Sequence, residues 1–282
     1  MVQESKGYTN PHLLISSKEL NEQIGQEQIK PIVVIDMRPT EAFATGHLPG
    51  AVHLDLFGIS LIDTDQAPLD AFMWIIAHLF VSRGVSADRN VVVYDEHSGI
   101  RAARAFWFLE FFGHTSVRVL NGGIGAWQRE GFQTTTVSIA PQASKWDVRW
   151  VNERIATWKD VKNKIGTKDV IILDTRSDNE YLGTIVRAKR GGAIPGSVHV
   201  EWTRNLAAGG VFKTASELNK IYKSAGITPD KDVISYCQGG YRAAHSYLTL
   251  RLLGYPKVRN YIGSWKEWGD RENLPIEIPT SI

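Results

Sequence analysis

The chain has 282 residues, a net charge of +2 and a single cysteine. So small a net charge excludes a strong electrostatic attraction to nucleic acid or to an acidic membrane, and one cysteine excludes an internal disulfide. The length fits two domains of average size. The first residues lack the basic and then apolar profile of a signal peptide, and the apolar segment 71–80 is too short to span a bilayer. We therefore expect a soluble, cytoplasmic protein without nucleic-acid or membrane partners.

The first half of the chain alternates predicted strands and helices. Residues 32–36 form a short apolar run rich in β-branched side chains, and residues 91–95 form another, as buried parallel strands require. Residues 101–114 carry apolar side chains at helical spacing, and Gly113 near their end suits a helix C-cap. This alternation predicts the α/β class, with a mostly parallel sheet and helices on both of its faces.

The second half repeats this pattern. Apolar runs at 170–174 and 233–237 and a helical pattern at 242–255 correspond to those of the first half. The first run of each half continues into Asp-x-Arg, at Asp36 and again at Asp174. The consistent offsets indicate one duplication.

The boundary between the copies lies in residues 133–150, which are polar, contain turn residues and lack a helical period. We predict a first domain over residues 1–135 and a second over residues 150–282, joined by a linker at about 133–150. Two domains that bury their own cores are expected to form a monomer.

The only cysteine, Cys237, ends a predicted parallel strand, at the sheet edge where α/β proteins bind ligands. Gly239 and Gly240 allow a tight turn with positive φ. Such a turn can aim successive N–H groups at one point, and the helix that follows adds its positive end. Arg242 adds a full charge. Together these features favour the thiolate, which is the nucleophilic form of cysteine.

A lone cysteine is more often an inert core residue, but the Gly-Gly turn and the arginine at a helix start favour a reactive thiol. The first copy serves as an internal control. It has Asp95 in the cysteine's place, in a loop that is one residue longer. Because an aspartate would repel an anion and cannot attack it, we predict that the first domain is catalytically inactive.

At these residues the chain resembles a two-domain rhodanese of the thiosulfate sulfurtransferase family. The resemblance rests on the duplication, on GHLPGAVH (46–53) and GAIPGSVH (192–199), on CQGGYRA (237–243) and on YIGSWKEWG (261–269). It implies two tandem rhodanese-like domains and a double displacement. The Cys237 thiolate would take the outer sulfur of thiosulfate as a persulfide and pass it to cyanide or a thiol acceptor. No metal or other cofactor is implied.

The resemblance also implies roles for the loop residues. The backbone N–H groups of Gln238, Gly239, Gly240, Tyr241 and Arg242 would stabilise the thiolate and the persulfide. The Arg242 side chain would hold the sulfonate end of thiosulfate by charge-assisted hydrogen bonds.

Eight extra residues between Asp174 and Pro195 carry three basic side chains, Arg187, Lys189 and Arg190. Lys189 falls nearest to a cationic substrate contact of mammalian relatives, although a solvated basic loop is an equal alternative. Glu180 stands where those relatives have a substrate-gripping arginine, which leaves the preferred sulfur donor open.

Other interpretations remain. The Asp-x-Arg pairs are better explained as structural ion pairs than as part of the site. Core packing is the preferred interpretation of Trp202, Trp265 and Trp268, and the wall of a cleft between the domains is the alternative. Mercaptopyruvate is a possible donor, but that branch typically has a Cys-Gly-Ser-Gly loop. A phosphatase would need Cys-x5-Arg, whereas this loop is Cys-x4-Arg. A persulfide carrier that serves a partner protein would use the same cysteine.

Overall fold

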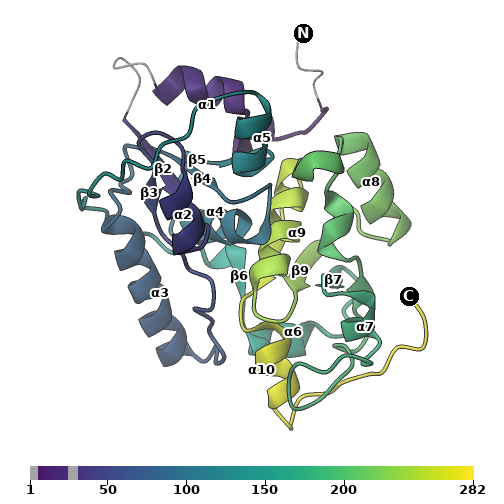
Figure 1. The fold of residues 1–282 in the computed structure, drawn as a ribbon. Coiled ribbons are helices and arrows are strands. Elements are labelled where there is room, and N and C mark those ends of the chain that lie inside the picture. Colours follow the sequence, from purple (N-terminus) through teal and green to yellow (C-terminus); the bar gives the residue numbers. More distant parts are fainter. Residues whose placement is uncertain (1–5, 25–30) are drawn as a thin grey trace.

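The structure is a computed structural model that describes residues 6–24 and 31–282. These residues contain two five-stranded sheets, one in each half of the chain (Figure 1). The strands of the first sheet are β1 (Leu14–Ile15), β2 (Ile32–Asp36), β3 (Val52–His53), β4 (Asn90–Tyr94) and β5 (Val117–Leu120). Those of the second are β6 (Ile155–Ala156), β7 (Val170–Asp174), β8 (Val198–His199), β9 (Asp232–Tyr236) and β10 (Val258–Tyr261).

The two sheets have the same topology. The first runs in the order β1-β5-β4-β2-β3 and the second in the order β6-β10-β9-β7-β8. Every strand pair in both sheets is parallel. The central strands are buried, as their β-branched composition predicts. The predicted duplication and α/β class are therefore confirmed.

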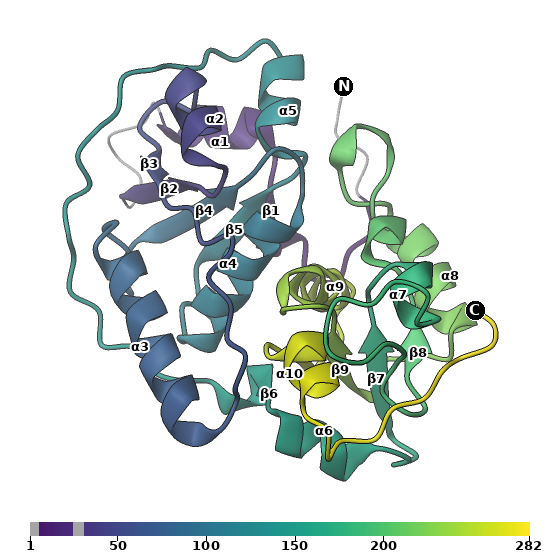
Figure 2. The same cartoon turned by 60° about the horizontal axis from the view of Figure 1, so that its bottom comes forward.

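Helices surround both sheets (Figures 1 and 2). They are α1 (Ser17–Ile24), α2 (Thr40–Thr45), α3 (Gln66–Val81), α4 (Ile100–Phe111), α5 (Gly123–Arg129), α6 (Trp158–Lys164), α7 (Asp178–Tyr181), α8 (Ala215–Ser224), α9 (Tyr241–Leu252) and α10 (Ser264–Asp270). The two longest predicted helical patterns correspond to α4 and α9. Gly113 and Gly254 follow them with φ of 81° and 85°, as C-terminal glycines require. None of the helices in the described ranges has the length and apolarity needed to cross a membrane.

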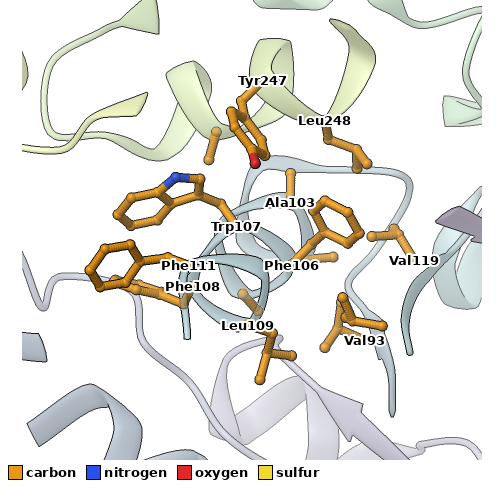
Figure 3. Packing of buried hydrophobic residues seen from close by; sticks show 14 of the residues in the cluster. Val93, Ala103, Phe106, Trp107, Phe108, Leu109, Phe111, Val119, Tyr247 and Leu248 are labelled. Carbon is orange, nitrogen blue, oxygen red and sulfur yellow. The ribbon is translucent and has the colours of Figure 1, made fainter. Parts of the chain in front are cut away.

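Helices α4 and α9 lie against each other between the two sheets. In Figure 3, Tyr247 and Leu248 of α9 face Trp107 and Ala103 of α4. One cluster of buried apolar side chains extends through both copies and includes these four. The duplicated domains therefore share a core, and residues of the first domain can reach the second domain's sheet edge.

The link between the copies runs along the outer side of the first sheet (Figure 2). Ser144 donates its backbone N–H to the Val81 carbonyl, and Val151 donates to the Phe111 carbonyl. Residues 136–151 form neither helix nor strand, as their polar composition predicts. These bonds attach the part of the link from Ser144 to Val151 to the first domain.

Candidate active site

Cys237 directly follows β9 and has 1% of its surface exposed. Its backbone is held from both sides by the Gly-Ser-Trp motif at the start of α10. Its N–H donates to Ser264 Oγ at 3.1 Å, and its carbonyl accepts from the Trp265 N–H at 2.9 Å. Ser264 has a positive φ of 51°, which is uncommon outside glycine. Ser264 and Trp265 therefore fix the backbone of Cys237 at the carboxyl end of the sheet.

The loop between Cys237 and α9 presents backbone N–H groups that the protein itself does not use. From Gln238 to Ala243, none of these groups donates to another residue in the described part of the chain. Gly240 has φ of 82° and forms the N-cap of α9, whereas Gly239 lies outside the left-handed region. The prediction of positive φ at both glycines is thus correct for Gly240 alone. The six N–H groups are available to an anion beside the sulfur.

The first copy shows where this kind of loop directs its N–H groups. The Asp95 carboxylate, buried at the same sheet position, accepts from the N–H groups of His97, Gly99, Arg101 and Ala102 at 2.9–3.3 Å. The loop therefore converges on a single negative charge. In the first copy the protein's own carboxylate supplies that charge and occupies the place of a reagent.

Arg242 does not stand free beside the cysteine. Its guanidinium forms a bidentate pair with Glu180 of α7, with distances of 2.5 and 2.9 Å. Burial opposes the ionisation of Glu180. The charge and hydrogen bonds of Arg242, together with the hydrogen bonds from Ser177, outweigh burial and lower the pKa of Glu180 to about 2. Most of the Arg242 charge is thus balanced within the protein. The Glu180 substitution noted in the sequence is structurally coupled to the arginine of the loop.

The basic insert reaches the loop at Arg187. The Arg187 carbonyl accepts from Gln238 Nε2 at 2.8 Å, and the Nε of Arg187 lies 3.7 Å from the Glu180 carboxylate. Arg190 donates to backbone carbonyls near the end of α10, including that of Gly269, and so has a structural role.

Lys189 lies apart from the cysteine loop. Its N–H donates to Asp270 and its Nζ is 4.0 Å from Glu272. Asp270 is at the opposite end of α10 from Ser264, roughly 9 Å along the helix axis. The structure thus gathers Cys237, Gln238, Gly239, Gly240, Tyr241 and Arg242 but leaves Lys189 at the surface.

The first domain contributes to this site, which the sequence did not reveal. The Tyr241 hydroxyl donates to the Leu56 carbonyl at 2.9 Å. The guanidinium of Arg104, from α4, stacks on the Tyr241 ring at 3.8 Å. The available signal was an arginine within an otherwise apolar helix face, but nothing in the sequence said which surface that face covers.

The structural interpretation is confirmed for the Asp-x-Arg pairs and for Trp265 and Trp268, whereas Trp202 is only half-buried. Arg176 binds Asp174 at 2.6 Å, and Arg38 binds Asp36 at the same distance in the first copy. Trp265 and Trp268 belong to the buried cluster of the second sheet, while Trp202 packs edge-on against His245.

The comparisons with known proteins establish the family. A model of the Rhodanese-like domain matches residues 16–130 and again residues 157–271. The first match covers β2 to β5 of the first sheet, and the second covers β7 to β10 of the second sheet. The chain therefore belongs to the rhodanese family and contains two tandem rhodanese-like domains.

Several relatives are similar over nearly the whole chain. Thiosulfate sulfurtransferase of Pseudomonas aeruginosa is 31% identical, covering 94% of this chain and 97% of the relative. Thiosulfate sulfurtransferase of Corynebacterium glutamicum is 35% identical, covering 96% and 92%. The sulfur carrier protein TtuD of Thermus thermophilus is 34% identical, covering 96% and 98%. These relatives support sulfur transfer as the general activity.

A solved structure with the same fold is wild-type EanB, which is 22% identical with a TM-score of 0.84. The match covers 96% of this chain and 70% of EanB. At this identity the likeness concerns the fold alone. A related solved structure, of an EanB variant with ergothioneine, holds a covalent link to a cysteine persulfide in that protein.

Proposed function

We propose that this protein is a thiosulfate sulfurtransferase that works through a persulfide on Cys237. The observation that carries the proposal is the thiol at the end of β9, beside six N–H groups that find no acceptor among residues 6–24 and 31–282. Relatives named thiosulfate sulfurtransferase support the same chemistry. A persulfide on the cysteine of the structural neighbour EanB is a precedent for the intermediate on this fold.

The reaction proceeds by two displacements. The Cys237 thiolate attacks the outer sulfur of thiosulfate, the S–S bond breaks, and its electron pair leaves with sulfite. The enzyme then holds an anionic persulfide, which the loop N–H groups stabilise. Cyanide or a thiolate attacks the terminal sulfur, and Cys237 departs as a thiolate. No oxidant or reductant is consumed, because sulfur moves between nucleophiles with the charge conserved.

The first domain has no corresponding chemistry in this proposal. Asp95 replaces the thiol, and its carboxylate already occupies the N–H groups of its loop. The roles we assign to the second domain are sulfur transfer for Cys237 and anion binding for the backbone from Gln238 to Arg242. The Arg242 side chain orients Glu180 and α7, because its charge is paired. Lys189 remains a sequence prediction without a contact that supports it.

The test is the intact mass of the protein after brief exposure to thiosulfate, with Cys237→Ser as the matched variant. We expect a gain of about one sulfur atom in the wild type alone, removed by cyanide with release of thiocyanate. A gain with mercaptopyruvate but not with thiosulfate would move the protein to the sister activity. No gain with either donor would overturn sulfur transfer through Cys237.

A persulfide carrier is the second candidate, favoured by the 34% identity to the sulfur carrier protein TtuD. A carrier forms the same persulfide but gives it to a protein. The two functions separate in the second half-reaction. Rapid turnover with cyanide or a small thiol supports the enzyme, whereas a loaded protein that releases sulfur only to a protein acceptor supports the carrier.

A further inference from the structure

Arg104 is a buried charge in the wall between the domains. It belongs to α4 of the domain without cysteine and has 1% of its surface exposed. Its Nη1 donates to the Leu56 carbonyl at 3.3 Å. Its Nε and Nη2 have no hydrogen-bond partner within residues 6–24 and 31–282. A buried guanidinium with two unused donors is costly to fold, so its retention calls for a ligand or a function.

The surroundings of Arg104 point to Cys237. The guanidinium stacks on Tyr241, the fourth residue after the cysteine. The acidic groups that influence its charge are Tyr241 and Cys237. Burial lowers the pKa of Arg104 to about 10, so the side chain stays charged at neutral pH. Arg104 and the Tyr241 hydroxyl both donate to the Leu56 carbonyl, so the guanidinium is fixed against the loop that begins at Cys237. Because a tyrosine hydroxyl is neutral at that pH, the thiolate is the anion that this loop offers to it.

Neighbouring arginines have counter-ions of their own. Arg242 pairs with Glu180, and Arg101, one turn earlier on α4, pairs with Asp55 at 2.6 Å. In the described ranges no carboxylate forms an ion pair with Arg104. Of the arginines around the catalytic loop, Arg104 is thus the one whose charge the protein leaves unbalanced.

We infer that Arg104 of the first domain is the counter-charge of the Cys237 thiolate and of the persulfide that forms on it. This inference rests on the proposed function. In that cycle the sulfur centre is anionic at both stages, first as thiolate and then as persulfide, so one fixed cation serves both. The domain that lost its cysteine retains a part in the reaction by supplying this charge. Arg104 acts through Cys237 and is a positioning residue.

Other charged groups lie on the elements around the cysteine loop. They are Arg242 of α9 with its partner Glu180 of α7, Asp174 of β7, and the Lys266–Asp270 pair of α10. Each of these groups is paired within the protein, since Arg242 binds Glu180, Lys266 binds Asp270 and Asp174 binds Arg176. Changes in these pairs would alter the field less than removal of an unpaired charge.

The test is the pH profile of Cys237 alkylation by the neutral reagent iodoacetamide in the full-length protein. In Arg104→Met we expect the profile to move up by about one to three pH units, with a roughly ten-fold or greater loss of rate at neutral pH. The anionic reagent iodoacetate should lose more rate than iodoacetamide. Because Arg104→Lys keeps the positive charge, its profile should lie between those of Arg104→Met and the wild type. Arg101→Met, which removes an already paired charge from the same helix, should leave the profile unchanged.

Thermal unfolding separates this role from a structural one. Because Arg104→Met removes a buried charge with two unused donors, we expect its Tm to equal or exceed that of the wild type. A lower Tm with an unchanged alkylation profile would overturn the inference. Alkylation requires no sulfur donor, so its outcome is independent of the proposed function. If Arg104→Met shifts the alkylation profile but the wild-type protein gains no sulfur from thiosulfate, only the sulfur-transfer proposal is refuted.

Discussion

The pairing of Arg242 with Glu180 changes how the site treats an anion. An arginine in a loop of this kind would ordinarily offer its full charge to a substrate. Here a carboxylate with 3% of its side chain exposed satisfies both of its terminal nitrogens. In the proposed function, substrate binding therefore depends on the backbone N–H groups of the loop more than on the Arg242 side chain.

Glu180→Gln tests the effect of this pairing on the substrate. Without the carboxylate, the Arg242 charge is free to attract thiosulfate, so we expect KM for thiosulfate to fall roughly five-fold, or ~1 kcal/mol. Steady-state kinetics with cyanide as acceptor measure it. Asp178→Asn is the matched control on the same helix, since the Asp178 side chain is exposed and bonds only to His199 among the described residues. An unchanged or higher KM in Glu180→Gln would contradict the role of Glu180 as the balancing charge.

The same carboxylate predicts a pH dependence of stability. The pKa of Glu180 is about 2 in the folded protein against 4.5 ordinarily. Below pH 4.5 the unfolded chain binds a proton that the folded chain does not, so the stability due to Glu180 is complete above about pH 4.5 and is lost as the pH falls toward 2. The free energy of unfolding, measured by urea denaturation at each pH across this range, should depend less on pH in Glu180→Gln than in the wild type. A slope equal to that of the wild type would show that the pair does not stabilise the fold.

At this scale the sequence predicts Cys237 as the reagent, which stays a prediction, but it does not reveal the charged groups around the loop. Cys237 was predictable because the strand, the glycines and the helix start are contiguous. Glu180 is 62 residues away from Arg242 and was noticed only as a replaced arginine. Arg104 lies in the other domain, and its role depends on how α4 meets α9, which helical periodicity does not specify.

The element that sets the geometry of the site is the turn between β9 and α9. Its Gly240 has φ of 82°, and an added Cβ would lie 2.9 Å from the Ile262 carbonyl oxygen. At Gly239 the nearest atom would be Ser60 Oγ at 3.5 Å, an ordinary contact, and φ is outside the left-handed region. The two adjacent glycines therefore differ in what they can tolerate.

We expect Gly240→Ala to destabilise the protein by about 1–3 kcal/mol and to slow persulfide formation, because strain would move the N–H groups. Gly239→Ala is its control for stability, with an expected change of less than about 1 kcal/mol. Urea midpoints and mass gain after thiosulfate measure both. Equal stability of the two variants would show that the turn is not held in the left-handed conformation.

The duplication also shows how far an element-level prediction reaches. Matching apolar runs predicted both sheets and the paired helices correctly, because parallel strands and helix ends leave local signals. The sequence also indicated Asp95 as the counterpart of the cysteine. It did not show that this carboxylate binds four N–H groups of its own loop, since the closure of a loop on its first residue depends on backbone angles.

The two domains behave structurally as one body. Glu267 of the closing signature is buried and accepts from the N–H of Thr64 at 2.7 Å and from its hydroxyl, across the domain boundary. The YIGSWKEWG motif (261–269), which resembles a family motif, therefore also connects the two domains. The shared apolar cluster around α4 and α9 adds to this contact. We expect cooperative unfolding of both domains, because neither can leave without exposing the shared core.

His245 makes this interface sensitive to acid. It is fully buried on α9 and shares a 2.8 Å hydrogen bond with the Ser98 carbonyl of the first domain. Burial lowers its pKa from 6.5 to about 4, against a smaller opposite effect of that bond. Between these values the unfolded chain takes up a proton that the folded chain does not, so stability is complete above about pH 6.5 and falls as the pH drops to 4, by roughly 3 kcal/mol.

His245→Gln should remove most of this loss, because the amide can donate to Ser98 but does not titrate. The measurement is the difference in unfolding free energy between pH 7 and pH 4, compared within each variant so that a change in packing against Phe212 cancels. His78→Gln on the exposed face of α3 should retain the wild-type difference. If His245→Gln retained it as well, acid would destabilise the protein at groups other than His245. The shared core would then hold the domains together down to pH 4 without a contribution from this histidine.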